Sequence, residues 1–179
     1  MDGQVLVAYA TKHGATEGIA DKVGQSLRDN GLKAEVIPVG QIGDLHPYEA
    51  VVLGSAVYAG QWRNEAVAFL KAHGHTLAER PVWLFSTGPT GEGEPVELTK
   101  GWRFPEAQQA MADRIQPRDI ALFHGALDMQ KLNLAEKLIV KAVKAPAGDF
   151  RNWEAITTWA QSIAAELSQS EQGLEQSET

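Results

Sequence analysis

The sequence predicts an α/β protein in which one parallel sheet carries helices on both faces. Five short apolar segments alternate with segments of helical period, and strands that alternate with helices form parallel sheets joined by right-handed crossovers. The apolar segments are continuous rather than interrupted by polar residues, as expected for strands covered on both faces. We therefore predict a doubly wound, five-stranded parallel sheet.

The predicted strands are short runs of aliphatic and β-branched residues. They occupy residues 5–10, 34–39, 50–56, 81–86 and 120–123. The predicted helices have apolar residues spaced three and four apart. They occupy residues 14–30, 64–73, 105–115 and 153–167. Gly31 and Gly74 follow the first two helices, and glycine is favourable just past the end of a helix.

The chain of 179 residues is long enough for one domain with a sizeable core. We assign residues 1–167 to that domain. Residues 168–179 are polar and acidic and contain no aromatic side chain. A segment of this composition cannot bury much apolar surface, so we expect a disordered tail there.

Composition excludes several classes of function. The formal net charge is −7, which argues against nucleic-acid binding because phosphate contacts need a basic face. No cysteine is present, so redox chemistry would need a bound cofactor. The histidines lack metal-ligand spacing, and no metal site is predicted. Without a signal-peptide pattern or an apolar run approaching ~20 residues, a cytoplasmic protein is expected.

Three polar or glycine-rich segments follow the first, third and fourth predicted strands, and so meet at one edge of the sheet. The first, residues 11–16, reads Thr-Lys-His-Gly-Ala-Thr and opens a helix. Free N–H groups and the positive end of the helix dipole favour an anion there. The segment has neither a Walker motif nor Gly-x-Gly-x-x-Gly. The alternative is that Thr11 or Thr16 simply caps the helix.

The other two segments suit a planar ring. Residues 55–62 contain Tyr58 and Trp62, on which a ring could stack; alternatively, both aromatic side chains close the edge of the core. Residues 87–95 are rich in glycine and offer backbone donors and acceptors.

The pattern Thr-x-x-Gly-x-Thr after the first strand, with matching segments after the third and fourth, resembles the flavodoxin family. The resemblance implies strand order 2-1-3-4-5 and bound FMN, with its phosphate at the first segment and its isoalloxazine ring between the other two. His13 departs from the family, which usually has threonine there. The implied cofactor-binding residues are Thr11, Lys12, His13, Gly14, Ala15, Thr16, Ala56, Val57, Tyr58, Ala59, Gly60, Thr87, Gly88, Pro89 and Thr90.

Within that superfamily the chain is similar to the menaquinone-dependent protoporphyrinogen dehydrogenases. The similarity covers most of the chain and includes GSAVYAGQW, RPVWLFST, EKLIVKAVKAP and NWEAITTWAQSIAAEL. It implies an insertion after the fifth strand and an FMN-dependent oxidoreductase that passes electrons to a quinone, with protoporphyrinogen IX as the candidate donor. Residues 88–97 are acidic where that family is expected to be basic. Other cations that could meet substrate carboxylates are Lys100, Arg103 and Lys131.

Two alternatives stay open. An acidic flavodoxin-type electron carrier would dock on basic redox proteins and need no small-molecule substrate. A flavodoxin-like binding module without FMN would be colourless.

Residues 131–145 form an amphipathic segment with lysines on one face and apolar residues on another. The favoured interpretation is a surface helix whose apolar stripe packs on the core. The alternative is peripheral contact with the inner face of the cell membrane, where a quinone would be met.

Overall fold

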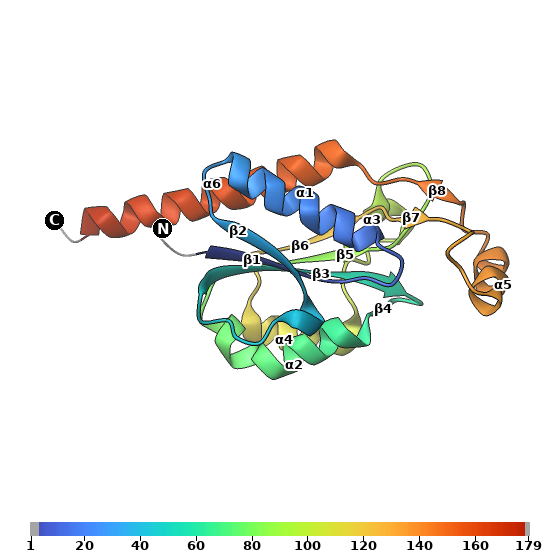
Figure 1. Ribbon diagram of the computed structural model, residues 1–179, viewed down its shortest axis with the longest axis horizontal. Coiled ribbons are helices and arrows are strands. Elements are labelled where there is room, and N and C mark those ends of the chain that lie inside the picture. Colours follow the sequence, from blue (N-terminus) through green and yellow to red (C-terminus); the bar gives the residue numbers. More distant parts are fainter. Residues whose placement is uncertain (1–3, 178–179) are drawn as a thin grey trace.

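The computed structural model describes the backbone of residues 4–177 and the side chains of residues 4–170. A parallel sheet forms its centre, with strand order β2-β1-β3-β5-β6 (Figure 1). The strands are β1 (Gln4–Ala10), β2 (Ala34–Pro38), β3 (Tyr48–Tyr58), β5 (Val82–Thr87) and β6 (Asp119–Phe123). Numbered among themselves, these strands follow the order 2-1-3-4-5, so the predicted topology is confirmed.

Helices cover both faces of the sheet (Figure 1). One face carries α1 (Ala15–Asp29) and α6 (Trp153–Ser177), and the other carries α2 (Asn64–Ala78) and α4 (Gln109–Ile115). Successive side chains of a strand point to opposite faces, so Val7 joins the cluster under α1 and α6 while Leu6 joins the cluster over α2. Both faces are buried, which explains why the strands are continuously apolar.

Shorter elements complete the chain. They are the 3-10 turns η1 (Val39–Gln41) and η2 (Glu106–Gln108), strand β4 (Gln61–Trp62), helix α3 (Pro95–Leu98), and the insertion elements β7 (Ala126–Leu127), α5 (Leu134–Val143) and β8 (Gly148–Asp149). Strand β4 pairs antiparallel with β3, and β7 pairs antiparallel with β8. The predicted insertion after the last strand of the sheet is therefore present.

Helix α2 corrects one predicted boundary. It continues through Gly74 to Ala78 instead of ending at His73. Glycine inside a helix costs roughly 1 kcal/mol relative to alanine, but the extra turn buries Leu77 completely. Burying a leucine contributes roughly 1.5–3 kcal/mol, so packing outweighs the local preference.

Two other helices also differ from their predicted limits. The segment predicted as one helix over residues 105–115 divides into η2 and α4. Helix α6 runs to Ser177, beyond the expected end at residue 167. The disordered tail is expected over residues 168–179, and residues 178–179 of that range lie outside the described residues. The assignment of residues 1–167 to one domain stays a prediction.

Helix α5 contradicts the favoured interpretation of residues 131–145. None of its residues is buried, so its apolar stripe does not pack on the core. The physical reason is that α1, α6, α2 and α4 already cover both faces of the sheet (Figure 1). The insertion instead projects beyond the sheet, at the end where the parallel strands finish.

Candidate functional site

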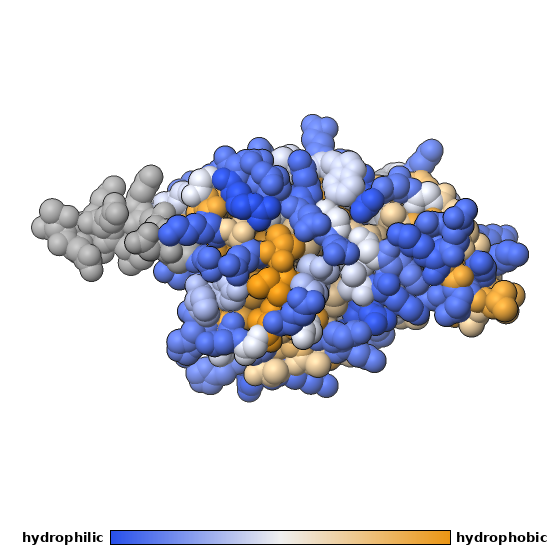
Figure 2. Space-filling model, viewed as in Figure 1, coloured by the Kyte–Doolittle hydropathy of each residue, from blue (hydrophilic) through white to orange (hydrophobic). Residues whose placement is uncertain are grey.

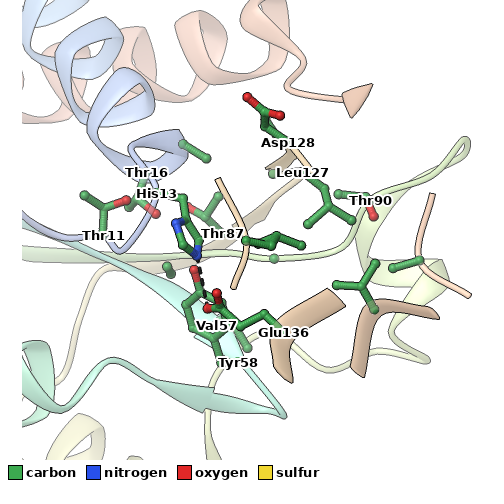
Figure 3. Close-up of a pocket in the computed structure, with 18 of the residues that line it drawn as sticks. Thr11, His13, Thr16, Val57, Tyr58, Thr87, Thr90, Leu127, Asp128 and Glu136 are labelled. Atoms are coloured by element: carbon green, nitrogen blue, oxygen red, sulfur yellow. Dashed lines mark hydrogen bonds and ion pairs between the residues drawn. The ribbon is translucent and has the colours of Figure 1, made fainter. Parts of the chain in front are cut away.

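A cavity of about 280 Å³ lies at the carboxyl edge of the parallel sheet. The segments that follow β1, β3 and β5 line it, and residues of the insertion complete its wall. Thr11, His13 and Thr16 lie on one side, Thr90 on the opposite side, and Thr87 between them (Figure 3). The cavity therefore occupies the edge at which open α/β sheets bind ligands.

The first segment forms a tight turn into α1. The backbone N–H of Gly14 donates to Thr11 Oγ1 at 3.0 Å, and Gly14 has a φ of +89°, in the left-handed region that favours glycine. Neither threonine provides a side-chain cap for α1, so the alternative N-cap interpretation is wrong. Ala15 and Thr16 line the cavity, and the start of the helix offers its unpaired N–H groups there.

Two buried hydroxyls in the cavity wall have no hydrogen-bond partner among the residues that the structure describes. They are Oγ1 of Thr16 and Oγ1 of Thr87, whose residues are 0% and 3% exposed. An unsatisfied buried polar group costs about 1–3 kcal/mol, and such groups need an explanation in a native structure. A polar ligand in the cavity would supply the missing partners.

The second segment is a hairpin rather than the loop expected over residues 55–62. Strand β3 continues to Tyr58 and pairs with β4 through a two-residue turn. Ala59 and Gly60 form that turn with φ of 49° and 73°, as a type I′ turn requires. The hairpin holds the end of β3 against the cavity.

The two aromatic residues of this hairpin have different roles. Trp62 is core: it is 3% exposed, donates from Nε1 to Ser86 Oγ at 2.8 Å, and packs edge-on against Phe104. Tyr58 lines the cavity and is 41% exposed. Of the two rings considered for stacking, only Tyr58 faces the site.

Two cationic side chains and one imidazole lie near the Tyr58 ring. Lys12 Nζ and Arg63 Cζ each lie 6.0 Å from the ring centroid, and His13 meets the ring edge-on at 6.5 Å. Desolvation by burial raises the pKa of the Tyr58 phenol, so the ring is neutral at physiological pH. The result is a neutral aromatic surface with a cationic rim.

The third segment is fixed to the end of β6. Gly88 donates its N–H to the Phe123 carbonyl at 3.2 Å. The buried His124 places Nδ1 3.0 Å from the Pro89 carbonyl oxygen and Nε2 2.7 Å from that of Gly93. A neutral imidazole can donate only one of these two hydrogen bonds. Because both contacts join the end of β6 to the third segment, His124 holds residues 89–93 at the edge of the sheet.

The insertion closes on the first segment through Glu136. Glu136 Oε1 lies 2.5 Å from Lys12 Nζ and 3.1 Å from His13 Nε2, the second contact being visible in Figure 3. A capping box with Asn133 fixes the carboxylate at the start of α5. The Lys12 hydrogen bond, followed by the Asn133 N–H, lowers the pKa of Glu136 to about 2. Lys131 adds a hydrogen bond from Nζ to the His13 carbonyl at 3.3 Å.

The structure brings together most of the sequence-predicted site residues. Those that line the cavity are Thr11, His13, Ala15, Thr16, Ala56, Val57, Tyr58, Ala59, Thr87, Gly88 and Thr90. Lys12, Gly14, Gly60 and Pro89 belong to the same segments but do not line it. Within the part of the chain that the structure describes, no group of His, Cys, Asp or Glu is placed to hold a metal ion.

The sequence prediction missed the contribution of the insertion. The additional lining residues are Gly125, Ala126, Leu127, Asp128, Leu132, Glu136, Ile139, Val140 and Ala145. One local signal was available, because Asn133 and Glu136 have the spacing of a capping box. That signal predicts where a helix begins, but it cannot predict which neighbour the carboxylate contacts.

Comparisons with known proteins agree with this arrangement. The flavodoxin domain family matches residues 6–153. An archaeal flavodoxin structure has a TM-score of 0.61 at 12% identity, covering 92% of this chain and 99% of that one. A flavodoxin from Streptococcus pneumoniae TIGR4 has a TM-score of 0.59 at 16% identity, with the same coverage.

Among curated proteins, the protoporphyrinogen IX dehydrogenase [quinone] of Escherichia coli K12 is 22% identical over 172 residues, covering 90% of this chain and 94% of its own length. The family match spans the sheet, all three segments of the cavity wall and the insertion. This chain therefore belongs to the flavodoxin domain family.

Proposed function

We propose that the cavity binds FMN and that the protein is an FMN-dependent oxidoreductase. The observation that carries this proposal is the pair of buried hydroxyls of Thr16 and Thr87, which lie at two places in one cavity wall and have no hydrogen-bond partner among the described residues. Thr16 lies at the start of α1, which suits a phosphate, and Thr87 ends β5, where a ring edge would lie. When bound, the flavin accepts and donates electrons.

The chain's own residues would hold each part of the cofactor. The phosphate would take hydrogen bonds from the Thr11 and Thr16 hydroxyls and from the start of α1. The ring would lie between Tyr58 and the segment that begins at Thr87. Because Glu136 already engages Lys12 and His13, these two side chains would contribute less to phosphate binding than hydroxyls and backbone N–H groups do.

We propose a quinone as the electron acceptor. The relative's name specifies a quinone for that protein, and the insertion adds apolar side chains to the cavity wall. They are Leu127, Leu132, Ile139 and Val140. An apolar wall beside the ring site suits a second, hydrophobic ring system. No described helix is both long and apolar enough to cross a membrane. We propose a cytoplasmic protein that meets the quinone peripherally.

We propose protoporphyrinogen IX as the electron donor, because the relative's name specifies it for that protein. Of the cations considered for its carboxylates, Arg103 reaches the Ile120 carbonyl near the start of β6, away from the cavity. Lys131 lies beside the first segment. The cationic rim at Tyr58 adds Lys12 and Arg63. These groups, and not the acidic third segment, would meet a carboxylate.

The second candidate is a flavodoxin-type electron carrier. The solved structures that share this fold include proteins named flavodoxins, and the net charge of −7 suits docking on basic redox proteins. A carrier would use the same cofactor site and would need no substrate at its rim.

The visible spectrum of the purified protein tests the cofactor, followed by identification of any flavin released on denaturation. Anaerobic photoreduction and reoxidation by a menaquinone analogue then test the reaction, with protoporphyrinogen IX as the alternative reductant. We expect FMN, two-electron reduction and rapid reoxidation by the quinone. A one-electron-reduced form that persists and is not reoxidised by the quinone supports the electron-carrier function. Colourless protein that takes up no FMN overturns both.

A further inference from the structure

The outer surface of α5 is apolar and faces solvent. Its large apolar side chains are Leu134, Leu138, Ile139 and Val143, which are 82%, 69%, 63% and 67% exposed. Single exposed apolar residues are ordinary, but a group of them on one element marks an interaction surface. Figure 2 shows apolar atoms gathered at the end of the molecule that α5 occupies in Figure 1.

These side chains form one continuous face. Successive helical residues are 100° apart, so Leu134, Leu138, Ile139 and Val143 span about half of the circumference. We call these four residues the outer face of α5. The remaining part of the helix carries Glu136, which contacts the first segment, and Val140, which lines the cavity. Ile139 lines the cavity as well, so the outer face of α5 meets the cavity at this residue.

Positive charges border one side of this outer face, next to Leu134. Lys137, Lys141 and Lys144 belong to α5 or end it, and none of them forms an ion pair with a described residue. The concentration of lysines contrasts with the net charge of −7 for the chain. A helix with an apolar face and flanking lysines has the composition of helices that lie in the interface of anionic membranes.

Charge also argues against other binding partners for the outer face of α5. A second copy bound face to face would bring the lysines of two α5 helices together, which is unfavourable. A soluble acidic protein would satisfy the lysines but would need a matching apolar groove. An anionic bilayer satisfies both the lysines and the apolar face at once.

We propose that α5 docks this protein on an anionic lipid bilayer, with the outer face of α5 in the interfacial region. Because Ile139 and Val140 also line the cavity, docking turns the cavity toward the lipid. The use of the docked cavity for quinone reduction rests on the proposed function, whereas the docking of α5 on the bilayer requires no flavin.

The absence of cysteine from the chain allows a site-specific test. Leu138→Cys in the full chain is labelled with an environment-sensitive fluorophore and mixed with vesicles of phosphatidylcholine alone or with phosphatidylglycerol. Ala72→Cys is the matched control, because it lies on the exposed surface of α2, which covers one face of the sheet away from α5. We expect a blue shift at position 138 with phosphatidylglycerol vesicles and none at position 72.

Co-sedimentation of unlabelled protein separates the two contributions. Leu134→Ser with Leu138→Ser should weaken partitioning by on the order of tenfold to a hundredfold, because two apolar side chains no longer leave water. Lys141→Gln should weaken it about fivefold. Leu98→Ser, an exposed leucine of α3, and Lys71→Gln, an exposed lysine of α2, should change it little.

Several results would overturn the proposal. One is equal binding of the wild type and the Leu134→Ser/Leu138→Ser variant to anionic vesicles. Another is no binding of the wild type, and a third is a concentration-dependent blue shift at position 138 without lipid, which would indicate a second copy. Thermal melting checks that each variant folds. A protein that binds anionic vesicles but whose reduced form is not reoxidised by quinone would support this proposal and refute the proposed acceptor. A failure of the docking proposal is therefore distinguishable from a failure of the proposed function.

Discussion

Thr16 and Thr87 place buried hydroxyls in the cavity wall without a partner among the described residues. Each unpartnered hydroxyl costs stability, and the proposed FMN would offset that cost by supplying a hydrogen-bond partner. If the proposed site is correct, a mutation at either residue should change ligand binding without lowering the stability of the ligand-free protein.

Thr16→Val removes one of these hydroxyls at almost constant volume. We expect the free energy of unfolding without FMN to stay unchanged or rise, because no hydrogen bond is lost. The dissociation constant for FMN should rise about tenfold to a hundredfold through loss of a hydrogen bond to the phosphate. Thr157→Val, whose hydroxyl donates to the Trp153 carbonyl on α6, is the control. Unchanged FMN affinity would contradict the assignment of Thr16.

Gly54 shows a different residue-scale constraint, set by packing inside the sheet. Gly54 on β3 is the direct cross-strand neighbour of Phe85, and an added Cβ would lie 1.9 Å from the Phe85 ring. That ring is fully buried and packs on Phe123 and Trp159. It therefore cannot move aside without disturbing the core.

Gly54→Ala should lower the free energy of unfolding by about 3 kcal/mol, the upper part of the range for overpacked cores. Urea denaturation measures the change. Gly43→Ala, where an added Cβ meets nothing within 4 Å, should stay within about 0.5 kcal/mol. A loss below about 1 kcal/mol at Gly54 would show that the Phe85 ring relocates freely.

At the scale of elements, the insertion acts on the site through one carboxylate. Glu136 joins α5 to Lys12 and His13. Its pKa is lowered from the ordinary 4.5 to about 2, chiefly by the Lys12 hydrogen bond. The contact therefore stabilises the packing of α5 against the first segment above pH 4.5, and this stabilisation is lost as the pH falls toward 2.

Glu136→Gln removes the charge at every pH while keeping a residue that suits the capping box. We expect lower protection of the α5 amides at neutral pH, after division by the intrinsic exchange rate, and a protection similar to that of the wild type in acid. Glu154→Gln, in the first turn of α6, is the control. Unchanged exchange in α5 would show that the contact does not hold the helix.

At the scale of the whole molecule, ligand binding should stabilise the entire fold. The cavity wall draws on segments from both halves of the sheet and from the insertion, so unfolding anywhere in the sheet would release a ligand. Any ligand that binds only the folded state raises the free energy of unfolding by mass action.

FMN added at about one hundred times its dissociation constant should raise Tm by roughly 5–10 °C. Riboflavin, which lacks the phosphate, should raise it less at equal concentration, because the first segment then has no anion to bind. Differential scanning calorimetry measures both. Equal shifts with the two ligands would contradict a phosphate site at residues 11–16.

The sequence patterns by themselves determined a parallel sheet, its two helical layers and the three segments at the sheet edge, whereas the strand order followed from the resemblance to the flavodoxin family. Continuous apolar runs report burial on both faces, and crossover handedness then leaves few arrangements. Local patterns failed where packing decided: α2 passes Gly74 because Leu77 is buried. Trp62 and Tyr58 look alike in sequence, yet one is core and the other faces the cavity.

Only the tertiary structure decided what the insertion does. The sequence shows that residues 131–145 are amphipathic, but an apolar stripe does not reveal what it packs against. Because four helices already cover the sheet, α5 has no core to join and leaves its apolar side chains in solvent. The contact of Glu136 with Lys12 joins residues far apart in the chain. Periodicity records which residues share a face, whereas three-dimensional packing decides what that face meets.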